Sequence, residues 1–180
     1  GDAVYTASGN IAVMDETACC VKVYDQEGEF LLQMGREGSG PGELLHPGGL
    51  ILLSDGSVGV LDAPTGGLHC FSEDGSFDTL LIDFQGQPMP QWAWGADSMA
   101  FVGAYTTTSM EEEGMMANFT IGRWEDSFQP SVTYVEKSFP FHPEDMASFL
   151  NNTIFSAAFA AERDGTVYIA DISSEDYRVD

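Results

Sequence analysis

Residues 35–47 read Gly35-Arg36-Glu37-Gly38-Ser39-Gly40-Pro41-Gly42-Glu43-Leu44-Leu45-His46-Pro47, and the rest of the chain is organised around them. Their content of Gly and Pro excludes a helix or a regular strand and predicts a loop. Apolar sequence rich in β-forming residues lies on both sides, and the sequence after the loop closely copies the sequence before it. We therefore interpret residues 35–47, which we call the connector, as the joint between two copies of one structural unit.

The repeat is visible when Asn10-Ile-Ala-Val-Met-Asp15 is aligned with Ser57-Val-Gly-Val-Leu-Asp62, an offset of 47 residues (57 − 10 = 47). The offset continues without a gap in both directions and matches Tyr24 with Phe71. A third copy, residues 164–171, ends 109 residues after the second (171 − 62 = 109). Repeats of roughly 40–50 residues built from short strands are typical of the blades of a β-propeller.

In each of the first two units, the pattern of apolar runs and turn residues predicts four short strands. We expect these strands at residues 4–7, 11–14, 21–24 and 30–34, and again at residues 50–53, 58–61, 68–71 and 77–82. Asp55-Gly56 and Asp74-Gly75 supply the positive φ that tight hairpin turns need. The alternation of side-chain character within these runs fits strands that have two different faces.

The third and fourth units depart from this pattern. The third has strands expected at residues 98–102, 118–123 and 131–136, and an insert over residues 104–117 that we expect to be a solvated loop or a contact surface. Pro143 then favours the start of a short helix that includes Met146, Phe149 and Leu150. The fourth unit has strands expected at residues 153–160 and 167–170 and the start of another at Tyr177.

These units predict an all-β fold, a β-propeller of four-stranded antiparallel blades with about three and a half blades in this chain. The blades are expected at about residues 3–34, 49–83, 92–137 and 153–180, the last one incomplete, within a single partial domain. Fewer than four blades leave bare blade faces. We therefore expect a fragment of a larger propeller, or a chain that associates with another through exposed blade faces.

Composition narrows the classes of partner. The chain has 180 residues, 43% of them hydrophobic, which suits one domain with a core. Six Lys and Arg against 29 Asp and Glu give a net charge of −23, which repels nucleic acid and anionic membrane surfaces. No run reaches the roughly 18 apolar residues of a transmembrane segment. Cys19, Cys20 and Cys70 form no metal pattern, and we favour buried or free thiols over a disulfide.

Four segments together carry a family resemblance: residues 35–44, residues 47–50, residues 55–62 and residues 68–75. They resemble an NHL-repeat unit, and the form Gly-x-Gly-Pro-Gly-Glu is similar to six-bladed propeller proteins common in Bacteroides-type bacteria. The resemblance implies an NHL/TolB-like propeller and, because many such proteins are predicted lipoproteins or exported proteins, an extracytoplasmic location in the periplasm or at the cell surface. It implies no particular activity, since propellers include enzymes, lectins and scaffolds.

Asp15, Asp62 and Asp171 recur at the end of the second strand of three units. Repeated carboxylates invite a metal or acid–base interpretation. A residue that recurs at one position of every blade more often performs the same structural task, here a hydrogen bond to the backbone of the following turn. We favour the structural interpretation for all three.

Candidate ligand-binding residues lie in the connector and at the joint before the third unit. Arg36 and Glu43 either bind each other and lock adjacent blades, or line one face of the disc together with His46. Trp92 and Trp94 alternate along an expected inner strand, so they share a face. They form either inter-blade core or a stacking platform for a sugar or peptide at the mouth of the channel.

The sequence predicts no catalytic residue, no metal site and no cofactor. It contains neither a Gly-x-Ser-x-Gly nor a His-Glu-x-x-His motif. His46, His69 and His142 lie in different loops and strands, and we favour structural or surface roles for them. The expected inner strands carry no His, Asp or Glu.

We therefore expect a non-catalytic, exported binding or scaffolding propeller that recognises a protein, peptide or glycan through loops on one disc face. The alternative is a propeller hydrolase or lyase whose channel metal is supplied partly by blades outside this chain. A third interpretation is a structural fragment without activity of its own.

Overall fold

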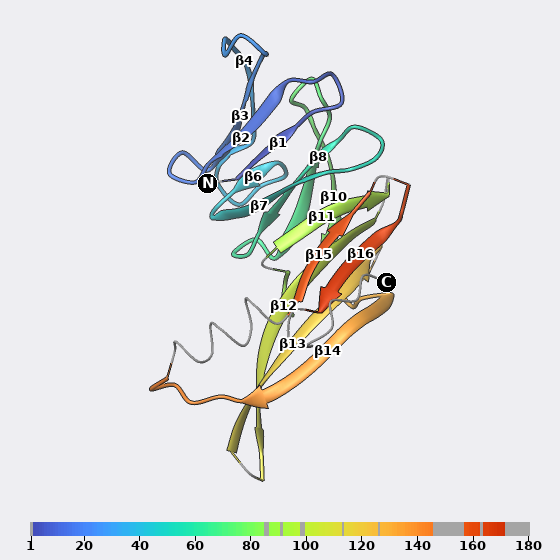
Figure 1. The fold of residues 1–180 in the computed structure, drawn as a ribbon. Helices are drawn as coiled ribbons and strands as arrows, with labels where there is room; N and C mark the ends of the chain where they lie inside the picture. The colour runs from blue at the N-terminus through green and yellow to red at the C-terminus, as the bar shows by residue number, and fades with distance from the viewer. Residues whose placement is uncertain are drawn as a thin grey trace.

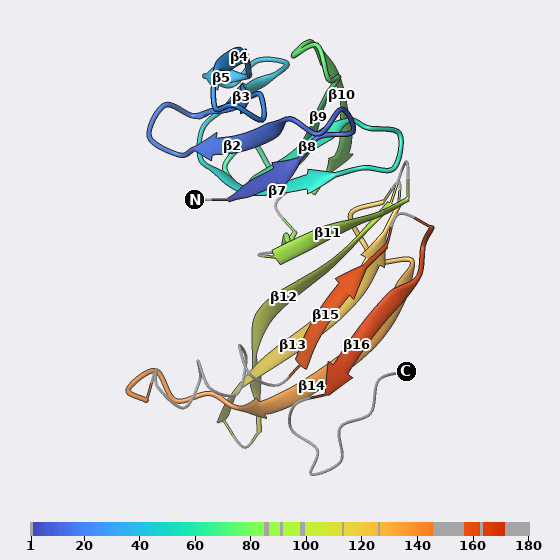
Figure 2. The same ribbon diagram turned by 45° about the horizontal axis from the view of Figure 1, so that its top comes forward.

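The computed structural model describes residues 2–84, 87–90, 92–97, 100–112, 114–125, 127–145, 157–162 and 164–171. Within these residues the fold is all-β, and it contains three four-stranded sheets and a pair of two-stranded sheets. Figures 1 and 2 show the larger sheets stacked side by side in chain order. Each four-stranded sheet is antiparallel throughout, as expected for a blade. None of the described segments is a helix that could cross a membrane.

Blades 1 and 2 follow the repeat closely. Blade 1 comprises β1 (Ala3–Tyr5), β2 (Ile11–Asp15), β3 (Cys20–Tyr24) and β4 (Phe30–Met34). Blade 2 comprises β7 (Pro47–Leu52), β8 (Val58–Asp62), β9 (Gly67–Phe71) and β10 (Phe77–Asp83). Between them the connector contributes β5 (Arg36–Glu37) and β6 (Glu43–Leu44), which pair in parallel.

Blade 3 corrects the expectation of a loop-like insert. It comprises β11 (Trp92–Asp97), β12 (Ala100–Glu111), β13 (Gly114–Trp124) and β14 (Val132–Pro140). Residues 104–117 are not a loop, because β12 and β13 pair in register from Phe101 opposite Trp124 to Glu111 opposite Gly114. The run of β-branched Thr residues at 106–108 explains this, since such residues favour strands, and the charged residues gather at the turn.

The fourth sheet is described in part. β15 (Ala157–Ala161) pairs antiparallel with β16 (Val167–Asp171). The helix expected after Pro143 falls mainly on residues 146–152, and the strand expected from Tyr177 falls in residues 172–180, so both lie outside the described residues. Residues 142–145 form a turn in which the Asp145 N–H donates to the His142 carbonyl at 2.8 Å.

Three apolar layers between the sheets form the core, because alternate residues of a strand face opposite neighbours. The layer between blades 1 and 2 includes Val21, Val60 and Phe71. The layer between blades 2 and 3 includes Leu61, Phe101 and Trp124, with the last two rings stacked at a centroid distance of 5.5 Å. The layer between blade 3 and the fourth sheet includes Ile121, Phe159 and Ile169.

The direction of the strands places particular turns on one side of the disc. In Figure 2, β1, β7, β11 and β15 run the same way, and the second strand of each sheet returns. The turns between second and third strands therefore open on one side, and so does the connector, which leads into β7. We call this side the connector face.

The inner strands approach each other closely, and this generates a first prediction. A Cβ added to Gly95 in β11 would overlap the carbonyl oxygen of Leu52 in β7. We expect Gly95→Ala to lower the free energy of unfolding by about 1–3 kcal/mol, because the two backbones must separate. The control is Gly48→Ala, whose Cβ would meet no atom within 4 Å. Urea unfolding of both variants measures the difference, and equal losses would contradict the close approach.

Candidate functional site

Arg36 and Glu43 bind each other across the connector. The Arg36 guanidinium donates to Glu43 Oε1 from Nε at 3.0 Å and from Nη2 at 2.8 Å. Glu43 Oε2 accepts a third hydrogen bond from the Gly40 N–H at 2.8 Å. The pKa of the Glu43 carboxyl lies below its usual value of 4.5. The hydrogen bond from the Gly40 amide is the largest cause, and the hydrogen bond from the Arg36 guanidinium is the next largest. The predicted pairing of these two residues is confirmed.

The glycines of the connector are required where it folds back on itself. Gly38 has a φ of +152°, and an added Cβ would overlap the Glu43 carboxylate. Gly42 has a φ of +71°, and an added Cβ would lie 2.7 Å from the Cβ of Phe77 in blade 2. Only glycine combines such backbone angles with so little space. The motif therefore shapes a tight loop against the next blade.

Asp62 fastens this loop to blade 2. Its side chain is fully buried at the end of β8, where Oδ2 accepts the Leu45 N–H at 2.6 Å and Oδ1 accepts the His46 N–H at 3.0 Å. The structural interpretation of Asp62 is right, but the expected partner is wrong. The carboxylate binds the connector and not the turn after β8, because the connector brings two consecutive free amides to it.

Asp15, at the equivalent position of blade 1, behaves as expected. Its Oδ1 accepts the N–H of Ala18 in the following turn at 2.9 Å, and its Oδ2 accepts Lys22 Nζ at 2.6 Å. The pKa of the Asp15 carboxyl is lowered. The hydrogen bond from Lys22 is the largest cause, and the hydrogen bond from the Ala18 amide is the next largest. The side chain of Asp171 lies outside the described residues.

The histidines do not form a common site in the described part of the chain. His69 is buried in β9, and its Nε2 lies 2.8 Å from Thr65 Oγ1, whereas its Nδ1 has no hydrogen-bond partner. Burial lowers the pKa of His69. The side chains of His46 and His142 are exposed. Among the residues that the structure describes, no three His, Cys, Asp or Glu side chains are grouped to hold a metal ion.

The three cysteines are buried and free, as favoured from the sequence. Burial raises the pKa of all three thiols, to about 12 for Cys70. The thiol of Cys19 donates to the Leu45 carbonyl oxygen at a sulfur–oxygen distance of 3.2 Å. Cys19 is thus a further contact between blade 1 and the connector.

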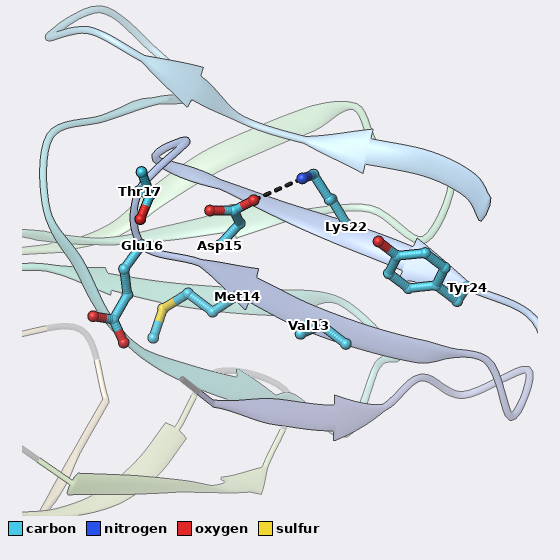
Figure 3. Close-up of a pocket in the computed structure, with 7 residues that line it drawn as sticks. All are labelled: Val13, Met14, Asp15, Glu16, Thr17, Lys22 and Tyr24. Carbon is cyan, nitrogen blue, oxygen red and sulfur yellow. Dashed lines mark hydrogen bonds and ion pairs between the residues drawn. The ribbon is translucent and has the colours of Figure 1, made fainter. Parts of the chain in front are cut away.

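Two surface features were not recognised from the sequence. The first is a shallow hollow of about 380 Å³ on the face of blade 1 that points away from blade 2, which we call its outer face. Val13, Asp15, Lys22 and Tyr24 are among the residues that line it (Figure 3). The ion pair between Asp15 and Lys22 crosses it. The sequence held one signal for this hollow. The 47-residue offset aligns these residues with positions that are buried in blade 2.

The second feature is the end of the hairpin formed by β12 and β13, which projects at the bottom of Figure 1. β11 pairs with β12 only as far as Ala104, and β14 pairs with β13 only as far as Met116. The hairpin continues beyond both neighbours, and Met110 near its tip is 73% exposed. Its turn joins the second and third strands of the blade, so it belongs to the connector face.

Trp92 and Trp94 lie in β11, where they pair with Ala104 and Val102. Their side chains lie outside what the structure describes, so their proposed stacking role remains a prediction. Of the candidate binding residues, the structure joins Arg36 with Glu43. His46 lies in the same connector, and its backbone N–H binds the carboxylate of Asp62.

No protein-family model and no curated protein sequence matches the chain. Virginiamycin B lyase from Staphylococcus aureus matches 94% of this chain and 62% of its own length, at 10% identity and a TM-score of 0.52. The dihydro-heme d1 dehydrogenase NirN matches 95% of this chain and 41% of its own length, at 14% identity and a TM-score of 0.52. A putative exported protein from Bacteroides fragilis matches 100% of this chain and 70% of its own length, at 12% identity and a TM-score of 0.49.

Identities of 10–14% show the fold alone. Together with the four-stranded antiparallel blades, the likeness to the lyase and the dehydrogenase confirms that the chain folds as a β-propeller. The chain spans 62% of the length of the lyase. The assignment to the NHL type and the number of six blades stay predictions.

The buried carboxylate of Asp62 generates a second prediction. We expect Asp62→Asn to lower the free energy of unfolding by about 1–3 kcal/mol, because the new amide group cannot accept both connector N–H groups. Asp25→Asn, at an exposed turn where the Asp25 carboxylate accepts the amides of Glu27 and Glu29, is the control and should cost less. Chemical denaturation measures both variants, and a larger loss at Asp25 would refute the anchoring role.

The Glu43 carboxyl generates a third prediction, on pH. Its folded-state pKa is lowered, so it stabilises the folded chain above its usual pKa of 4.5, and this contribution is lost as pH falls through the folded-state value. Glu43→Gln should therefore lower the urea midpoint at pH 7 and leave a shallower decline in stability as the pH falls below 4.5. Glu27→Gln, at an exposed site, controls for the loss of one negative charge. Parallel acid declines in the wild type and Glu43→Gln would contradict the effect.

Proposed function

We propose that the chain belongs to a non-catalytic, exported binding or scaffolding propeller that recognises its ligand through the connector face. A protein or peptide is the ligand class that the surface favours, and a glycan is the other class to test. The observation that supports this proposal most directly is the projecting end of the β12–β13 hairpin.

Among the described residues, the β12 edge of the hairpin end has no strand beside it. No described strand pairs with residues 105–111 of β12 on the side away from β13. An extended peptide adds to such an edge through backbone hydrogen bonds, and the alternate side chains then give specificity. Thr106, Thr107 and Thr108 leave most of this edge uncharged, in contrast to the charged edges that exclude a further strand.

The side chains at the tip add a second form of recognition. Met110 is 73% exposed, and a flexible thioether adapts to differently shaped partners. Glu111 and Glu112 are exposed beside it, in a chain of net charge −23. A negative surface attracts a basic partner and repels an acidic one. We therefore propose an extended, Lys- or Arg-containing peptide segment as the preferred ligand.

The connector supplies a second, separate part of the connector face in this proposal. Arg36 is 76% exposed even though it pairs with Glu43, and the side chain of His46 is also exposed. Trp92 and Trp94 are proposed as the stacking residues nearer the channel, on the basis of their spacing in the sequence. The extracytoplasmic location is proposed on the resemblance carried by the connector motif.

A fourth prediction tests this surface with peptide arrays probed by the full chain. Basic extended peptides should bind, and binding should weaken as salt is raised because exposed charges are screened. Met110→Ala should reduce binding at least several-fold. Val132→Ala is the matched control, since Val132 is 43% exposed at the start of β14, next to the turn on the opposite face. Equal loss in both variants would remove the hairpin from the proposal.

Two further readouts separate the other functional classes. Glycan arrays are probed with the same variants and with Trp92→Ala and Trp94→Ala. Glycan binding that survives both Trp substitutions would contradict the stacking role. Metal analysis of the full-length protein tests the propeller hydrolase or lyase. Stoichiometric bound metal with turnover would replace the binding proposal by an enzymatic one.

A further inference from the structure

The outer face of blade 1 has the residues of a covered surface, yet it is exposed. The 47-residue offset matches Tyr24 with Phe71 and Phe30 with Phe77. In blade 2 the Phe71 side chain is 1% exposed and Phe77 packs against the first apolar layer, whereas Phe30 is 56% exposed. The rings of Tyr24 and Phe30 meet edge to face at 5.9 Å.

The same offset matches Tyr5, which is 69% exposed, with Leu52, which packs against the first layer. Three aromatic side chains on one face of a small sheet form an apolar surface of the kind that marks an interaction site. Equivalent positions in one repeat perform equivalent tasks, so the difference in exposure identifies a missing neighbour.

Blade 2 shows what covers these positions. Leu44 of the connector is fully buried in the same apolar layer as Phe71, and Gly42 lies against Phe77. The amides of Leu45 and His46 meet the carboxylate of Asp62. The cover of a blade face is therefore the preceding blade together with its connector.

The hollow on blade 1 lies where such a connector would sit. Four of its seven lining residues, Val13, Asp15, Lys22 and Tyr24, are the counterparts of Val60, Asp62, His69 and Phe71 (Figure 3). Asp15 and Lys22 neutralise each other across the opening, and their side chains are 30% and 35% exposed. An incoming pair of backbone amides can displace Lys22 from the carboxylate and take the place that Leu45 and His46 hold at Asp62.

We propose that the outer face of blade 1 is the docking surface for another blade of the same polypeptide, outside these 180 residues. The connector of that blade fills the hollow and donates two consecutive amides to Asp15. The comparison favours the same polypeptide as the source of this blade, since the chain spans 62% of the length of the lyase whose fold it shares. A second copy of this chain is a poorer occupant because its own connector is already bound to its own Asp62.

Thiol labelling tests the proposal on the 180-residue chain and on the natural full-length polypeptide. Phe30→Cys should react with a maleimide at least tenfold more slowly in the full-length protein than in the 180-residue chain. Glu27→Cys, on an exposed turn of the same blade, should react equally fast in both. In parallel, Asp15→Asn should lower the urea midpoint of the full-length protein as much as Asp62→Asn does, and that of the 180-residue chain much less.

Three results would overturn the proposal. One is equal labelling of Phe30→Cys in both proteins. Another is labelling in the 180-residue chain that slows as its concentration rises, since a second copy would then cover the face. The third is a natural polypeptide that supplies no further blade. Hydrogen exchange of β2 and β3 in the unmutated proteins gives the same comparison if Phe30→Cys folds poorly, with stronger protection expected in the full-length protein.

Discussion

The contact between a buried carboxylate and two consecutive backbone amides holds the arrangement of the first two blades. Asp62 ends β8 at the point where the connector returns, and it satisfies the N–H groups of Leu45 and His46, which cannot join a strand ladder there. The glycines of the connector serve other contacts of the same loop, because Gly38 leaves room for the Glu43 carboxylate and Gly42 lies against Phe77. Leu44 then enters the apolar layer between the blades.

The fold was predictable from the sequence because the repeat averages out local ambiguity. A single apolar run such as Val21-Lys22-Val23-Tyr24 is compatible with several folds, but its recurrence 47 residues later, with turns at the same places, is typical of a blade. The insert of blade 3 was predicted wrongly because it has no counterpart in the other units. Its Thr residues favour a strand, whereas its charged residues at 111–113 favour a loop, and pairing of β12 with β13 decided between them.

The site was less predictable for a physical reason. Side-chain types made the pairing of Arg36 with Glu43 one of two interpretations, because these opposite charges flank a loop, and the structure contains that pair. They did not show that Asp62 binds the connector, since this depends on where a distant backbone returns. The hairpin end and the hollow on blade 1 are properties of strand length and of a missing neighbour. Neither property can be read from a single residue.

The connector face combines a rigid part and a projecting part. Hydrogen bonds and buried side chains fix the connector, so its exposed Arg36 and His46 have a defined framework beneath them. The hairpin end, by contrast, is supported by the pairing of β12 with β13 and by β14 on one side only. A propeller separates these tasks well, because its core lies between blades and not under the turns.

The in-register pairing of β12 with β13 has a consequence for how such proteins diversify. A hairpin lengthens by adding one residue to each strand, so the turn moves outward while every pair below it keeps its facing. Ala117 and Phe119 are buried beyond the level where β11 ends, and β14 pairs with β13 as far as Met116, so the blade depends on the hairpin up to the pair of Ser109 with Met116. The turn beyond Ser109 and Met116 can therefore be exchanged, and new sequences grafted there would change what the surface displays without repacking the blade.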